Sequence, residues 1–186
     1  MGLDNLGQLH EAIVVGLRTK LGPAAKTVEA YPDIGRRIDI PAVFVELSEF
    51  EAGTDPGTGE TALVVHIQAR AVVDPNQRQA YLLVRELAAR IAVAIQHENW
   101  GLPIGLATLL QAGEDAMKPE LDSYLVWLVE WTHEIHLGKT TWPYPDETGL
   151  SLLLGIYPET GAGRADRYWP AGEAPPPDWG ESHHVQ

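Results

Sequence analysis

The sequence predicts an α+β fold in which a mainly antiparallel sheet of about four strands carries two helices on one face. Two pairs of strand-like segments follow one another along the chain, each pair joined by a short polar run. Two segments with helical periodicity lie outside these pairs. Because strands come in hairpins and do not alternate with helices, the order favours α+β over a parallel α/β sheet.

The first predicted helix covers residues 4–20. Its apolar residues recur mostly at three- and four-residue spacing, and Asp4 is the expected N-cap. Gly7 and Gly16 inside the segment count against a helix, because glycine costs about 1 kcal/mol relative to alanine.

The first predicted hairpin joins strands 41–51 and 61–73. Residues 61–73 alternate between two faces over their whole length, which is the period of a strand. The run 52–60 between them is rich in glycine and other turn residues, so we expect a long, mobile tip.

The second helix is predicted over 75–99. Asp74-Pro75 supplies a capping side chain followed by proline at the first helical position, and one continuous apolar stripe follows. The second hairpin then joins strands 104–112 and 121–137 through the polar tip 113–120.

The sheet face away from the helices is predicted to be too apolar for water. We expect it to be buried against other copies or partners. The residues on which this depends are Val64, Val72, Tyr124, Val126 and Leu128.

The composition changes after Gly138, which predicts a domain over 1–138 and a Pro/Trp-rich C-terminal extension over 139–186. The extension holds seven of the 14 prolines and three of the six tryptophans. We interpret it as an extended arm whose aromatic side chains dock on another subunit, or else fold back on their own domain. An apolar run, 150–157, is able to add as a strand to a neighbour's sheet edge.

Charge and composition exclude several functions. The formal net charge of -13 argues against nucleic-acid or anionic-membrane binding, which need lysine- and arginine-rich surfaces. The chain has no cysteine, so it forms no disulfide or thiolate metal site. It has no stretch of about 18 apolar residues and no apparent signal peptide, so no membrane association is expected.

No catalytic, cofactor-binding or metal-binding residue is predicted. His133 and His136 are three residues apart on a predicted strand, so they point to opposite faces, whereas zincins use histidines four apart on a helix. The glycines of 52–60 lack the lysine and the helix of a phosphate-binding loop. A small metal-dependent enzyme using these two histidines or His66 stays open as an alternative.

The first 138 residues resemble the tail terminator, or tail-completion, proteins of long-tailed bacteriophages. The resemblance combines a short amphipathic N-terminal helix with the hairpin PAVFVELSEFEAG…ETALVVHIQARAVVD. The helix DPNQRQAY… and the closing strand YLVWLVEWTHEIHLG complete it. It does not extend to the last 48 residues.

The resemblance implies a homo-oligomer, a hexameric ring in the virion neck that is assembled in the host cytoplasm. Such a ring caps the tail tube protein, ends its polymerisation and provides the surface that joins the head-tail connector. DNA passes through without specific binding, and an acidic protein suits such a conduit because like charges repel. A head-completion or neck adaptor is the main alternative, and a small acidic adaptor that binds a host protein is another.

The expected partner contacts lie in the two hairpin tips and in the extension. We expect the tips to project from the ring and to contact tube or connector. The residues are Gly53, Asp55 and Gly57 in the first tip, Glu114 and Asp115 at the second, and Trp142, Tyr144, Tyr157, Trp169 and Trp179 in the extension.

Overall fold

The chain divides into two compact units, residues 1–143 and 144–186, and each is described by itself. The structure is a computed structural model. It describes residues 3–31, 38–115, 121–141, 152–156, 160–161 and 163–174.

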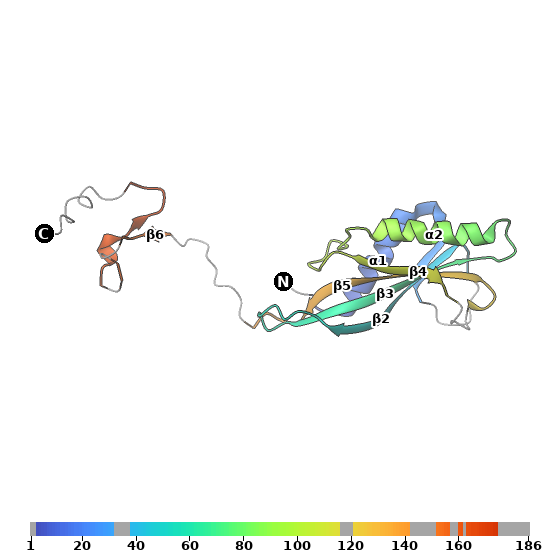
Figure 1. Ribbon diagram of the computed structural model, residues 1–186, viewed down its shortest axis with the longest axis horizontal. Helices are drawn as coiled ribbons and strands as arrows, with labels where there is room; N and C mark the ends of the chain where they lie inside the picture. The colour runs from blue at the N-terminus through green and yellow to red at the C-terminus, as the bar shows by residue number, and fades with distance from the viewer. Residues whose placement is uncertain are drawn as a thin grey trace. The chain divides into compact units, whose positions relative to one another are not determined.

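Five strands form one mixed sheet in the first unit (Figure 1). β1 is parallel to β2, and all other neighbours are antiparallel. The predicted α+β class, with two helices and a mainly antiparallel sheet, is confirmed, although the sequence did not predict β1. In spatial order the strands are β1 (Thr27–Ala30), β2 (Ala42–Ala52), β3 (Thr61–Val73), β5 (Leu125–Leu137) and β4 (Thr108–Glu114).

The two helices, α1 (Leu6–Leu21) and α2 (Ala80–Ile95), pack on the same face of the sheet, and α2 runs along its length (Figure 1). Their apolar stripes and the inward-facing strand residues form the main core. A single 3-10 turn, η1 (Gly22–Ala24), ends α1. The largest fully buried core side chains are Leu9, Ile13, Leu17, Ile67, Ile91, Ile95, Trp131 and Ile135.

Both predicted helix starts were wrong. The N-cap of α1 is Asn5, not Asp4, and its side chain accepts a hydrogen bond from the backbone N of Gln8. In the second case the Asp74 side chain accepts a hydrogen bond from Asn76 N at 2.8 Å, and this closes a turn. The helix then begins at Ala80, five residues later than predicted.

The strand bounds agree best for β3, which has the predicted residues 61–73. β2 is displaced by one residue from the predicted 41–51. β5 begins four residues late, because a turn closed by the hydrogen bond from Tyr124 N to Leu121 O precedes it. β4 also begins four residues late, at Thr108.

The helix-free face was predicted to be covered by other copies or partners, but its apolar end is covered by the chain itself. Val72 and Val126 are buried there, with 0% and 6% of their surface exposed. Segments that flank the strands supply the cover. The small second core comprises Ala42, Phe44, Val72, Leu121 and Val126, with Tyr31, Ile38, Ile40 and Tyr124 packed against it.

The described part of the second unit contains a two-stranded antiparallel sheet. β6 (Leu153–Leu154) pairs with β7 (Trp169–Pro170), and a 3-10 turn, η3 (Ala165–Arg167), precedes β7. Among the described residues of this unit, Trp169 is buried, with 8% of its surface exposed.

Candidate functional site

The centre of the helix-free face carries a network of polar side chains. Alternation along the strands places these residues on the face opposite the helices, and the register brings them side by side. A bulge between Leu47 and Glu49 keeps the later glutamates of β2 on this face. The network consists of Glu46, Glu49, Glu51, His66, Gln68, Arg70, Gln111, Asp115 and Glu130.

Arg70 lies at the buried end of this network, with 2% of its surface exposed. Its Nε donates to Asp115 Oδ2 at 2.8 Å, and its Nη1 donates to Glu46 Oε2 at 2.6 Å. Its Nη2 donates to Gln68 Oε1 at 2.6 Å, and the guanidinium lies 5.0 Å from the ring centroid of Tyr31. Since arginine stays ionised, these acceptors are what make its burial tolerable.

Glu130 is the buried acid of the network, with 8% of its surface exposed. Burial raises the pKa of Glu130, but hydrogen bonds from Gln111, Gln68 and His66 outweigh it, so the pKa lies below its usual value. The shortest of these bonds, from Gln111 Nε2, is 2.6 Å long. Glu130 therefore remains a carboxylate at neutral pH.

The opposite end of the network is acidic and open to solvent. The side chains of Glu49 and Glu51 are 72% and 69% exposed. His66 lies between them and Glu130, with Nδ1 3.4 Å from Glu130 Oε1 and Nε2 3.7 Å from Glu51 Oε1. The five carboxylates and one guanidinium of the network sum to a charge of -4, so this face repels a polyanion.

His133 lies on the other side of the sheet and takes no part in this network. It is 1% exposed, its Nε2 accepts from Trp100 Nε1 at 2.9 Å, and its Nδ1 donates to Gly105 O at 2.8 Å. Burial lowers its pKa, and the bond to Gly105 opposes this more weakly. The sheet thus separates His133 from His66, and within the described residues no group of three or more acidic or histidine side chains has a metal-binding arrangement.

The first predicted contact tip, 52–60, and the described residues of the second, 113–115, lie at opposite ends of the sheet (Figure 1), and 116–120 lie outside the described residues. The β2–β3 tip adjoins Thr61, whereas the turn before β5 adjoins Val73. At about 3.3 Å per residue, the twelve steps of β3 separate these ends by roughly 40 Å. The structure therefore does not bring the two tips together.

The first tip, 52–60, is held by several hydrogen bonds. Asp55 Oδ1 accepts from Gly57 N at 2.8 Å, and Gly57 has φ +70°, which glycine adopts without strain. Thr141, which follows β5, donates its backbone N to Thr58 O at 2.8 Å. Asp55 and Gly57 are exposed, while Gly53 is half-buried against β3.

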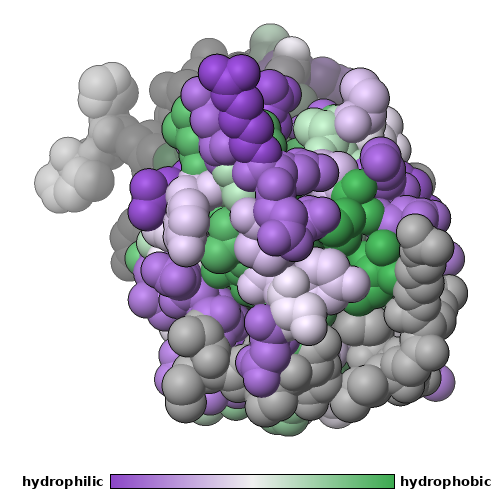
Figure 2. Space-filling view, turned by 90° about the vertical axis from the view of Figure 1, so that its right-hand side faces the viewer, coloured by the Kyte–Doolittle hydropathy of each residue, from purple (hydrophilic) through white to green (hydrophobic). Residues whose placement is uncertain are grey.

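At the other end of the sheet, the two predicted acids differ. Glu114 is exposed, but Asp115 is half-buried and pairs with Arg70. Figure 2 shows this end of the domain, where hydrophobic side chains appear as several separate spots among hydrophilic ones. Of the predicted contacts in the extension, Trp169 is buried, and Trp142, Tyr144, Tyr157 and Trp179 lie outside the described residues.

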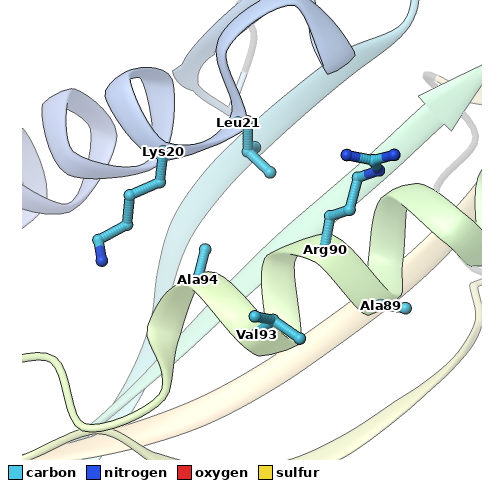
Figure 3. A pocket seen from close by; sticks show the side chains of 6 residues that line it. All are labelled: Lys20, Leu21, Ala89, Arg90, Val93 and Ala94. Atoms are coloured by element: carbon cyan, nitrogen blue, oxygen red, sulfur yellow. The ribbon is translucent and has the colours of Figure 1, made fainter.

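A shallow groove of about 480 Å³ separates the end of α1 from α2 (Figure 3). Lys20 from α1 and Arg90 from α2 stand at its two sides, and Lys20 Nζ lies 2.7 Å from Glu98 Oε1. The remaining lining is aliphatic, from Leu21, Ala89, Val93 and Ala94. This groove combines two cations with an apolar floor.

No protein-family model and no curated protein matches this chain. Within the described residues, neither helix has the length and hydrophobicity needed to cross a bilayer.

Proposed function

We propose that the protein is a structural component of a bacteriophage virion that forms a hexameric ring on the end of the tail tube. The ring ends polymerisation of the tube protein and provides the surface that the head-tail connector joins. The observation that carries this proposal is the position of the two tips, roughly 40 Å apart at opposite ends of one sheet. A subunit built in this way contacts two different partners at once.

The polar network supports a further part of the proposal, that the helix-free face lines the channel. Its exposed end presents Glu49 and Glu51, and its guanidinium is buried among acceptors. DNA phosphates therefore meet carboxylates there and find no exposed cation of this network to bind. Like charge keeps DNA from adhering to the wall of the conduit.

The length of the tails made without this protein tests the proposal. In a phage that lacks it, the tube has no stop signal, so we expect overlong tails, and the chain supplied from a plasmid should restore normal length. Tails of normal length that fail to join heads would instead identify a neck or head-completion adaptor. Normal, infectious particles would refute both functions.

A further inference from the structure

The outer edge of the sheet exposes leucines along an open strand. Among the described strands, β4 pairs only with β5, and Leu109 and Leu110 are 48% and 49% exposed. Val93 of α2, which is 72% exposed, lines a groove of about 300 Å³ together with Leu109. Proteins normally cover or charge such an edge, because its free backbone groups accept another strand.

The second unit contains a short strand, β6, whose apolar side chains are exposed to solvent. Leu152, Leu153, Leu154 and Ile156 in and beside β6 are 71%, 49%, 43% and 52% exposed. β6 pairs with the two residues of β7, and a two-stranded sheet is at best marginally stable in water. A third strand and an apolar surface would stabilise it.

We propose that β6 of one copy adds as a strand to the β4 edge of the next copy in the ring. Backbone hydrogen bonds would join the two strands, and the leucines of 152–156 would cover Leu109, Leu110 and Val93. Residues 152–156 carry no charge and β4 carries only Glu114, so electrostatic repulsion does not oppose the pairing.

The chain leaves the first unit on the side of the sheet away from β4. Gly138, with φ +103°, turns the chain, and Thr141 then bonds to Thr58 of the β2–β3 tip. That tip lies across β3 from β5, on the side away from β4. Ten residues, 142–151, separate the two described segments and can span at most about 33–36 Å, so chain length alone permits either edge. We place the contact on a neighbouring copy because the proposed ring requires a contact between copies.

A contact of this kind joins two different surfaces, so it is heterologous and closes when repeated around a ring. The inference rests on the proposed function for the ring itself. It adds the contact that links the subunits, and it gives the segment after the domain a role that the resemblance does not imply.

Disulfide trapping tests the contact directly, because the chain has no cysteine of its own. Neighbouring strands lie about 4.8 Å apart, within the distance that a disulfide spans between Cα atoms. Cysteines placed together at Leu110 or Gln111 and at Leu153 or Leu154 should yield a ladder of multimers on mild oxidation. Val15, which is 49% exposed on α1, replaces the β4 position in the control pair, and this pair should remain monomeric.

Oxidation is carried out on the free full-length protein and on assembled tails. A cross-linked monomer would show that β6 pairs with its own chain, and rings on tails without any ladder would show that another contact links the subunits. Either result overturns the inference and leaves the proposed function standing. A ladder from a phage whose tails keep normal length without the protein would overturn the proposed function alone.

Discussion

Arg70 is charged and almost fully buried because three side-chain acceptors surround its guanidinium. The alternation of residues 61–73 predicted that Arg70 points away from the helices. Its partners could not be predicted, since Glu46 and Asp115 are 24 and 45 residues away in sequence. Their meeting depends on strand register, and local pattern does not encode that.

Replacing Arg70 by methionine should therefore destabilise the domain strongly. The change removes Arg70 from its ion pair with Asp115, whose side chain is 8% exposed, and removing one partner of a buried pair costs about 3–5 kcal/mol. Urea unfolding measures the loss. Arg90→Met, at an exposed position on α2, should change the free energy of unfolding by no more than about 0.5 kcal/mol. Equal effects of the two substitutions would refute the structural role of the network.

His133 should make stability depend on pH. Burial lowers its native pKa below the ordinary 6.5, so between these two values the unfolded chain binds a proton that the folded chain does not. The contribution is fully present above pH 6.5 and is lost as pH falls, by up to about 1.4 kcal/mol per pH unit.

Unfolding of wild type and His133→Gln at pH 8, 6.5 and 5 measures this contribution. The stability advantage of the wild type should shrink toward pH 5. His97→Asn is the control, because His97 is exposed and asparagine tolerates its φ of +58°. A constant difference between wild type and His133→Gln across the range would contradict the assignment.

At the scale of elements, residue periodicity predicted the strand with a long regular pattern. It failed where one hydrogen bond sets the start of a helix or where a short strand depends on a non-local pairing. The unbroken alternation of β3 predicted both of its ends. The Asp-Pro signal before α2 marks a turn instead, because Asp74 caps Asn76 and Gln79 adopts a left-handed conformation before the helix begins. β1 was missed because four residues, TVEA, are too few to show a period, and its parallel pairing with β2 is non-local.

Gly16 counted against the first predicted helix, yet it lies within α1 because a side chain of another segment packs against it. A Cβ at this position would lie 2.5 Å from Cε3 of Trp100, whose indole packs there and bonds to His133. Gly16→Ala should lower the free energy of unfolding by about 1–3 kcal/mol, although alanine is the better helix former. Thermal unfolding measures it. Gly113→Ala, which has open space around its Cβ, should be close to neutral.

The β2–β3 tip should be needed for assembly and dispensable for folding. Replacing 53–59 by Asn-Gly leaves, together with residues 60–62, a five-residue connection between the paired Ala52 and Leu63, so the paired parts of β2 and β3 are kept. We expect a circular dichroism spectrum like that of the wild type and a large loss of phage titre. A normal titre from a folded variant would show that this tip contacts no essential partner.

At the scale of the whole molecule, the sequence establishes a net charge of -13, and the fold determines where that charge lies. The sequence predicted an acidic protein unsuited to binding DNA. Only the fold shows that a net charge of -4 is concentrated in one network on the helix-free face, opposite the helices. The groove on the helix side instead has Lys20 and Arg90 at its borders. In the proposed ring, this asymmetry would place the acidic face toward DNA and the helix side toward other proteins.

Imaging of the tail end in assembled virions tests the central claim most directly. Reconstruction of the neck by electron microscopy should show a ring of six copies between tube and connector. The β2–β3 tips should lie on one side of the ring, the turns before β5 on the other, and Glu49 and Glu51 should face the channel. A neck that contains no copy of this protein would contradict the account.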